Sequence, residues 1–295
     1  MSILQDFDYF KPTTIEFAID LISNNKNATI LAGGTDLIVN LKEGTATPEI
    51  VVDIKSLKDL KKIEFKDNCL IIGALVTFTD LLESVVIKEK FPLVWEVSKT
   101  VASVGIRNRA TMVGNICSAV PCLDSGPLLC VYEADVNVRS SKGKRKIPIK
   151  DWFLGNKKTA LKHGELVTHI SIPFPNQKTG GCYVRLGRYC GEDLAQVNVA
   201  LLAFANNAYR IAFGAVAPTP LRANKIESFL NGKKINDHLI EQAKELIPDE
   251  ISPITDIRAT KEYRMHMAKV MFERGIKTAV ERLNGDGLEY GESLV

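Results

Sequence analysis

The sequence predicts an α+β protein with two domains. Helix-period and strand-period hydrophobic patterns are interleaved in the first part of the chain, and a run of strands followed by helices fills the remainder. A chain of 295 residues, 45% of them hydrophobic and 25% charged, can bury a large core, and this length fits roughly two domains. The break at Pro173 and Pro175 marks the predicted boundary.

The first predicted helix covers residues 12–23. Pro12 stands at its start, Thr13 is the N-cap candidate, and Glu16 lies three positions further on, as in a capping box. Its apolar face consists of Ile15, Ala18, Ile19 and Ile22. This pattern predicts an amphipathic helix packed on the core.

Strand and helix signals then alternate. A strand over 29–34 runs into two adjacent glycines and a helix over 35–44, with Asp36 in its first turn and Gly44 as its end. Further strands are predicted over 49–54 and 62–74, the second interrupted by a turn at Asp67 and Asn68.

A broken helix and a long loop occupy the middle of the chain. The helical pattern over 77–103 is interrupted at Pro92, and the segment 107–127, rich in small residues, is predicted as a loop. Loops of this length are more often functional than decorative. Strands are expected again over 128–140, 145–153 and 165–175.

The second domain has a different pattern. An antiparallel meander is predicted over 182–189 and 195–218, with a turn at Asn206 and Asn207 and helices after it. The last helix, over 256–283, has a core-facing stripe made of Tyr263, Met267, Val270, Met271, Ile276, Val280 and Leu283.

Charge and termini exclude several classes of protein. The net charge of +3 is small, and the basic run Lys142–Lys146 lies in a predicted hairpin without interleaved aromatic residues, so it indicates a solvated turn and no nucleic-acid site. The first ten residues include acidic side chains where a signal peptide would be apolar, and no run approaches the ~20 apolar residues of a membrane span. We expect a cytoplasmic protein.

The cysteines are too few and too scattered for a disulfide scaffold, so we expect them to be reduced. They are Cys69, Cys117, Cys122, Cys130, Cys182 and Cys190. A metal site at Cys117, Cys122 and Cys130 is the alternative, but their spacing fits neither zinc knuckles nor plant-type iron-sulfur loops. Small buried thiols are the favoured interpretation, and no metal is expected.

Two glycine-bearing loops, AGGTD at 32–36 and TMVGN at 111–115, are the strongest functional signal, since no HExxH or GxSxG motif is present. Adjacent Gly33 and Gly34 do not fit the GxGxxG dinucleotide fingerprint. They indicate either a left-handed turn or a close approach to the backbone. Both loops offer backbone NH groups beside Thr and Asn, which suits a pyrophosphate.

Four stretches in order, LAGGTDLI, IRNRATMVGNICSAVPCLD, FGAVAPTPLRA and ATKEYRMHMAKVM, resemble the FAD-binding subunit of the molybdenum hydroxylases, the xanthine dehydrogenase and carbon monoxide dehydrogenase group. The resemblance implies a two-subdomain FAD-binding domain of the vanillyl-alcohol-oxidase/PCMH type over 1–175, with subdomains 1–57 and 58–175. A smaller C-terminal domain over 176–285, with a three-stranded antiparallel sheet and helices, and a flexible tail over 286–295 follow.

The resemblance also implies which residues contact FAD. The first loop contributes Leu31, Ala32, Gly33, Gly34, Thr35 and Asp36, and the second contributes Ile106, Ala110, Thr111, Gly114 and Asn115. Asp124 matches a carboxylate at the ribose or adenosine end, and Arg185 and Leu194 match positions near the flavin. Glu192 and Asp193 match an access loop, or else form a charged surface loop. Val113 stands where the family usually has a glycine.

For function, the resemblance implies a relay. A molybdopterin-binding large subunit oxidises the substrate, a small subunit with 2Fe-2S clusters transfers electrons, and the FAD of this chain passes them to NAD or another acceptor. No histidine lies in either loop, so FAD is expected to be noncovalent. Xanthine or a related purine is the favoured substrate, with carbon monoxide, nicotinate or aldehydes as alternatives. A stand-alone flavoprotein oxidase and an assembly subunit without FAD are the rival hypotheses.

Overall fold

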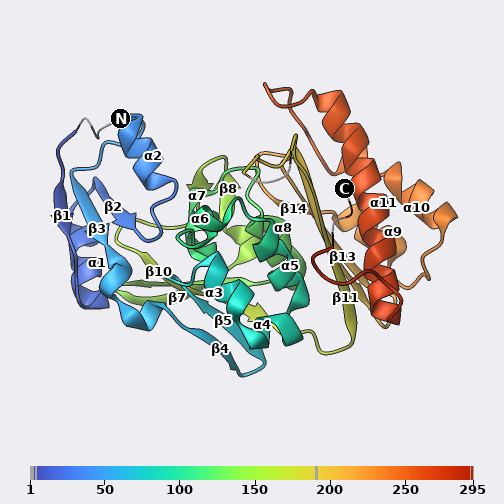
Figure 1. The fold of residues 1–295 in the computed structure, drawn as a ribbon, viewed down its shortest axis with the longest axis horizontal. Coiled ribbons are helices and arrows are strands. Elements are labelled where there is room, and N and C mark those ends of the chain that lie inside the picture. Colours follow the sequence, from blue (N-terminus) through green and yellow to red (C-terminus); the bar gives the residue numbers. More distant parts are fainter. Residues whose placement is uncertain (1–2, 4, 190–191, 293, 295) are drawn as a thin grey trace.

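The computed structural model describes residues 3, 5–189, 192–292 and 294, so Cys190 lies outside the described residues. Three lobes follow one another along the long axis of the molecule (Figure 1). The α+β class is confirmed, because sheets of three, five and four strands are each accompanied by helices.

The N-terminal lobe is a small parallel sheet of order β1-β3-β2 with two helices. Its elements are β1 (Asp8–Phe10), α1 (Ile15–Asn24), β2 (Ala28–Leu31), α2 (Leu37–Lys42) and β3 (Ile50–Asp53). Ala18, Ile19 and Ile22 of α1 are buried, as the pattern predicts. The predicted cap was wrong by one residue, because the Thr14 hydroxyl, not that of Thr13, accepts from the backbone NH of Phe17.

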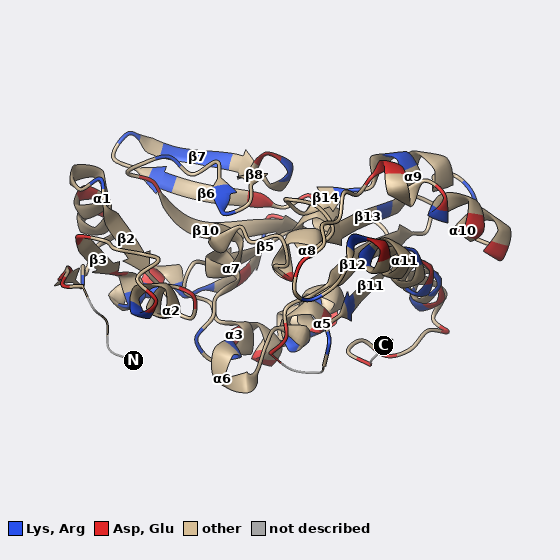
Figure 2. Cartoon of the chain, turned by 90° about the horizontal axis from the view of Figure 1, so that it is seen from above, with Lys and Arg blue, Asp and Glu red and all other residues tan. Residues whose placement is uncertain are grey.

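The central lobe contains an antiparallel sheet of order β4-β5-β10-β6-β7. Its strands are β4 (Ile63–Lys66), β5 (Cys69–Gly73), β10 (Leu166–Pro173), β6 (Asp135–Ser140) and β7 (Gly143–Pro148), and a separate pair is formed by β8 (Phe153–Gly155) and β9 (Lys158–Thr159). The predicted turn is confirmed, since Asp67 and Asn68 both have positive φ. Figure 2 shows the basic run on the exposed hairpin of β6 and β7.

Short helices cover this sheet toward the middle of the molecule (Figure 1). They are α3 (Phe78–Glu83), α4 (Val85–Lys90), α5 (Pro92–Thr100), α6 (Val104–Arg107), α7 (Met112–Ser118) and α8 (Ser125–Tyr132). The predicted break holds, because Pro92 is the first residue of α5. Two predictions were wrong: the loop over 107–127 contains α7, and residues 128–132 belong to α8 instead of a strand.

The error at α8 has a physical cause. All eight of its residues are buried, so the helix carries no polar face. An apolar run of this length cannot be assigned to helix or strand from periodicity alone. The helix lies between the central sheet and the C-terminal lobe (Figure 2).

The C-terminal lobe packs an antiparallel sheet, order β11-β12-β13-β14, against its helices. Its elements are β11 (Thr179–Leu186), β12 (Val197–Phe204), β13 (Tyr209–Gly214), β14 (Leu221–Arg222), α9 (Asn224–Leu230), α10 (Asp237–Lys244) and α11 (Lys261–Asn284). The first three strands are those expected, joined by the predicted turn, where Asn207 has positive φ. The two-residue β14 pairs with β13 and adds a fourth strand at the edge of the sheet. A strand this short has no recognisable sequence pattern, so it was not predicted.

Helix α11 begins later than predicted, at Lys261, where the Thr260 hydroxyl caps it. Met271 and Ile276 of the predicted stripe are buried, but Tyr263 is 44% exposed. The segment after α11, expected to be flexible, folds back on the central lobe. The Tyr290 hydroxyl accepts from the NH of Gly181, and the NH of Gly291 donates to Glu96.

Turns of 3-10 helix at Ile54–Ser56, Lys58–Leu60, Ile149–Asp151 and Ile247–Asp249 complete the architecture. Within the described ranges, no helix combines the length and apolar character needed to cross a bilayer. The same residues contain no group of three His, Cys, Asp or Glu side chains placed to hold a metal ion. Cys122 and Cys130 are buried, whereas Cys117, predicted as a buried thiol, is exposed at the surface of α7.

Candidate functional site

The two glycine-bearing loops meet in space. The first connects β2 to α2, whereas the second, predicted as a loop, is the Thr111 cap and first turn of α7, directly after the connection from α6 that carries Arg109 and Ala110. A Cβ atom on Gly33 would lie 2.0 Å from the carbonyl oxygen of Arg109, so only glycine allows this approach. Gly34 has a φ of +79°, a conformation that other residues rarely adopt. The two glycines therefore serve two purposes: contact between the loops and a left-handed turn.

The second loop is fixed by its own hydrogen bonds. The Thr111 hydroxyl caps α7 by accepting from the NH of Gly114 at 2.9 Å, and the Asn115 side chain accepts from the NH of Ser125 at 3.2 Å. The carbonyl of Ala110 accepts from the NH of Phe78, which ties the loop to α3. The segment is thus hydrogen-bonded to the start of both α3 and α8.

Val113, the departure from the family pattern, faces the core. Its side chain is only 5% exposed and belongs to the main hydrophobic cluster of the central lobe. A methyl-bearing side chain at this position therefore adds core packing on the side of α7 that faces away from solvent.

A cavity of about 260 Å³ lies where the loops meet. Its lining combines backbone from both loops with cationic and hydroxyl side chains: Ala32, Gly33, Lys55, Lys61, Leu75, Thr77, Asn108, Arg109 and Thr111. The ammonium group of Lys55 is 2.9 Å from Asp53, and that of Lys61 is 3.3 Å from Asp80. The sequence interpretation missed these cations, since isolated lysines have no pattern that distinguishes them from ordinary surface residues.

Asp124 lies at the start of α8, where the central lobe meets β11. Its Oδ1 atom accepts from the Tyr183 hydroxyl at 2.7 Å and from Arg185 Nε at 3.0 Å. The side chains of Asp124 and Arg185 are 12% and 11% exposed. Burial raises the pKa of Asp124 above its ordinary value, and the Arg185 charge and the Tyr183 hydrogen bond oppose that rise only in part.

The second carboxylate oxygen of Asp124 is free to bind a ligand. None of the described residues places a hydrogen-bond donor on Oδ2. The hydroxyl of Ser125 and the amide oxygen of Asn198 are fully buried and have no hydrogen-bond partner. Oδ2 of Asp124 does not belong to this group of atoms. Asp124 can therefore accept a hydroxyl donor on one oxygen while the other stays bound to protein.

The predicted access loop holds itself in place. The carboxylate of Asp193 accepts from the backbone NH and the guanidinium of Arg188, and the carbonyl of Asp193 accepts from Arg185. The Arg188 hydrogen bond lowers the pKa of Asp193. Leu194 is 53% exposed at the surface of this loop. The Asp193 carboxylate is thus used within the loop that the sequence analysis predicted as an access loop or a charged surface loop.

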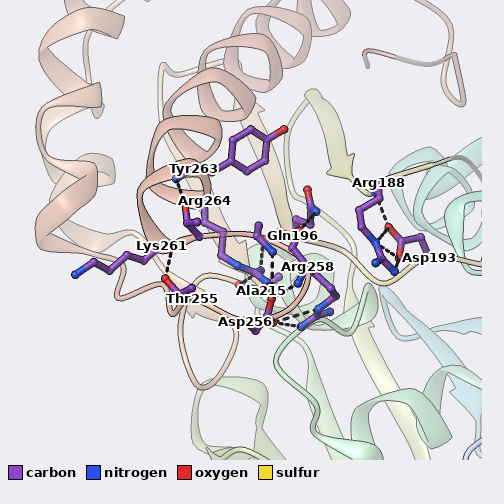
Figure 3. Close-up of polar contacts among 12 residues, drawn as sticks. Arg188, Asp193, Gln196, Ala215, Thr255, Asp256, Arg258, Lys261, Tyr263 and Arg264 are labelled. Atoms are coloured by element: carbon purple, nitrogen blue, oxygen red, sulfur yellow. Dashed lines mark hydrogen bonds and ion pairs between the residues drawn. The ribbon is translucent and has the colours of Figure 1, made fainter.

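A cluster around Asp256 supports this region (Figure 3). The carboxylate of Asp256 accepts from Arg258 and from Arg264, and Arg264 also donates to the carbonyls of Gln196 and Ala215. Arg264 is 1% exposed. The Gln196 side chain donates to the carbonyl of Arg258, which links the cluster to the strand that follows the Asp193 loop.

The structure brings some predicted residues together and separates others. Ala32, Gly33 and Thr111 line the cavity, and Asp124 contacts Arg185. Gly34, Thr35 and Asp36 lead away from this lining into α2, where burial raises the pKa of Asp36. Positions of the same prediction that are not part of the lining are Leu31, Ile106, Ala110, Gly114 and Asn115.

A second concavity, of about 490 Å³, lies over the outer face of the central sheet beside α1. It contains none of the predicted residues. Its cations are largely paired, as Arg139 is with Glu16 and Arg145 with Glu165. This face is a solvated sheet surface.

Comparison with known proteins finds matches over most of the chain. Residues 5–175 match the FAD binding domain in molybdopterin dehydrogenase, and residues 182–279 match the CO dehydrogenase flavoprotein C-terminal domain. The xanthine dehydrogenase FAD-binding subunit of Escherichia coli O157:H7 is 30% identical over 283 residues, covering 94% of this chain and 97% of that protein. The glyceraldehyde dehydrogenase medium chain of Sulfolobus acidocaldarius is 31% identical, covering 92% and 98%.

The solved structures agree. A chain of carbon monoxide dehydrogenase from Hydrogenophaga pseudoflava superposes with a TM-score of 0.92 at 30% identity, covering 96% of this chain and 99% of that one. The superposition therefore includes both matched domains and the segments that line the candidate site. The chain belongs to the FAD-binding subunits of the molybdopterin dehydrogenases, the molybdenum hydroxylase family.

Proposed function

We propose that this chain binds FAD noncovalently and transfers electrons within a molybdopterin and iron-sulfur complex. The observation that carries the proposal is the contact between the backbone of Gly33 and that of Arg109, beside a cavity lined with cations. Backbone NH groups and positive side chains together suit a pyrophosphate. Asp124 Oδ2 supplies an acceptor for hydroxyl groups of the same ligand.

The residues present fit FAD. Ala32, Gly33 and Thr111 would hold the pyrophosphate, with Lys55 and Lys61 neutralising its charge. Arg185, held between Asp124 and the carbonyl of Asp193, would place a cation beside the flavin. FAD itself would supply the ability to take up electrons singly and to release two together as hydride. The other predicted contacts, including Asp36, Asn115 and Leu194, belong to the same proposal.

The proposed partners are supported by relatives that are named as subunits or medium chains of dehydrogenases. A molybdopterin-binding large subunit and a small subunit with 2Fe-2S clusters would oxidise the substrate and deliver its electrons, and NAD is the proposed acceptor. Xanthine or another purine is the proposed substrate, supported by similarity to the xanthine dehydrogenase subunit. Relatives named for carbon monoxide and glyceraldehyde are as similar, so the partner subunit decides the substrate. A cytoplasmic location of the complex is part of the same proposal.

The test uses the full chain with FAD. We expect a flavin absorbance spectrum that bleaches with dithionite, and with NADH if nicotinamide is the acceptor, but not with xanthine alone. Adding the molybdopterin and iron-sulfur subunits should then let the organic substrate bleach the flavin. Bleaching of the lone chain by substrate would favour a stand-alone oxidase, and a folded chain that binds no FAD would favour the assembly subunit.

A further inference from the structure

Tyr183 is a buried side chain in the middle of β11 with three polar contacts. Its hydroxyl donates to Asp124 Oδ1 at 2.7 Å and accepts from the Asn198 amide at 3.0 Å, and its backbone NH donates to Glu96 at 2.9 Å. Tyr183 is 5% exposed. A phenol this deeply buried must satisfy its hydroxyl group, and here it does so on the carboxylate of the candidate site.

The contacts on Asp124 are unequal. The side chains of Tyr183 and Arg185, both on β11, each donate one hydrogen bond to Oδ1. Together the two bonds fix the plane of the carboxylate. Oδ2 accepts no hydrogen bond from the described residues and is the oxygen left for a ligand. The direction in which Oδ2 faces therefore depends on Tyr183 as well as on Arg185.

We propose that Tyr183 is a positioning residue for the cofactor: its hydroxyl holds Oδ1 of Asp124 and so directs Oδ2 toward the cofactor's hydroxyl groups. This inference rests on the proposed function, because it assumes that FAD is the ligand. Tyr183 would not touch FAD itself. It would act through the Asp124 carboxylate, because a hydrogen bond from a residue behind the site fixes the orientation of the group that contacts the ligand.

The electrostatic surroundings support a role that depends on pH. On β11 the carboxylate faces Arg185 and Tyr183, on β12 it faces the neutral Asn198, and across the access loop lies the Asp193 and Arg188 pair. Burial already raises the pKa of Asp124, and the Tyr183 hydrogen bond lowers it. Removing the hydroxyl should raise this pKa further, so that protonation, and with it loss of affinity for FAD, begins at a higher pH.

The experiment compares Tyr183→Phe with Tyr209→Phe in the full chain. Tyr209 is a matched control, because it is also buried and its hydroxyl donates to a backbone carbonyl, that of Lys233, at 2.9 Å. The dissociation constant for FAD is measured by flavin fluorescence across a pH series, with thermal melting of each variant without FAD. We expect about a tenfold weaker affinity near pH 7 for Y183F, the scale of one hydrogen bond to a charged group.

Two further results decide the outcome. The pH below which affinity falls should move upward in Y183F and stay in place in Y209F. Asp124→Asn should weaken FAD binding, and adding Y183F to it should cause no further loss. Equal affinities and pH profiles for Y183F and Y209F, or additive losses with D124N, would overturn the positioning role. A folded wild-type chain without affinity for FAD would instead overturn the proposed function, and this inference with it.

Discussion

Arg282 and Glu96 form a buried ion pair across 186 positions of the chain, with Nη2 to Oε1 at 2.8 Å and Nη1 to Oε2 at 3.1 Å. Their side chains are 3% and 4% exposed. The pair joins α11 of the C-terminal lobe to α5 of the central lobe, and Glu96 also accepts from the backbone NH groups of Tyr183 and Gly291. One carboxylate thus holds together two lobes and the C-terminal segment.

Replacing Glu96 with Gln should destabilise the protein strongly. The variant keeps the shape of the side chain but leaves the guanidinium of Arg282 buried without a counter-charge, which costs about 3 kcal/mol in the free energy of unfolding. Urea unfolding measures the loss. Glu89→Gln, at an exposed position on α4, is the control and should change stability by less than about 0.5 kcal/mol. Equal stability of the two variants would contradict the role of the pair.

Gly33→Ala should abolish FAD binding and lower stability. The added Cβ atom would lie 2.0 Å from the Arg109 carbonyl, so the two loops must separate. Gly44→Ala, just after α2, is the control: Gly44 has a positive φ of +68°, but nothing lies within 4 Å of the new atom. It should cost about 1 kcal/mol from backbone strain and retain FAD. Titration of both variants with FAD distinguishes contact between the loops from strain.

Asp256→Asn should destabilise the protein near neutral pH and hardly at all in acid. Partial burial alone would raise the pKa of Asp256, but hydrogen bonds from Arg258 and Arg264 hold it well below its ordinary value. A depressed folded-state pKa gives stability that is complete above the unfolded pKa of about 4 and is lost as pH falls through the folded value.

The difference in unfolding free energy between wild type and D256N should therefore be about 3 kcal/mol at pH 7 and shrink steadily below about pH 4. Chemical unfolding at a series of pH values checks this. A constant difference across the series would show that the ionised carboxylate is not what stabilises the cluster.

Local signals predicted local structure well. The apolar spacing of Ala18, Ile19 and Ile22 predicted α1, and the residue pairs at 67–68 and 206–207 predicted the hairpin turns, because each depends on neighbours in sequence. The end of a helix was harder to place. Thr13 and Thr14 are both good caps, and the choice between them depends on where the preceding chain turns.

Long-range features could not be predicted from residue spacing. Tyr183 contacts Asp124 across 59 positions, and nothing in either segment indicates the other. Lys55 and Lys61 line the cavity only because the 3-10 turns between β3 and β4 lie beside the connection from α6 to α7. The reason for Gly33 was likewise hidden, since its neighbour Arg109 belongs to a different lobe.

Lys61→Gln should weaken FAD binding in a manner that depends on salt. Lys61 lines the cavity, and its ammonium group, 3.3 Å from Asp80, would supply positive charge to the proposed pyrophosphate. We expect about a fivefold loss of affinity at low ionic strength, the scale of one partly exposed charge, and a smaller loss in high salt, where such interactions are screened. Lys62→Gln is the matched control: the neighbouring lysine, 52% exposed and 3.6 Å from Asp59, is not part of this lining. FAD titrations of both variants at two salt concentrations test the assignment, and equal affinities for K61Q and K62Q would remove Lys61 from the site.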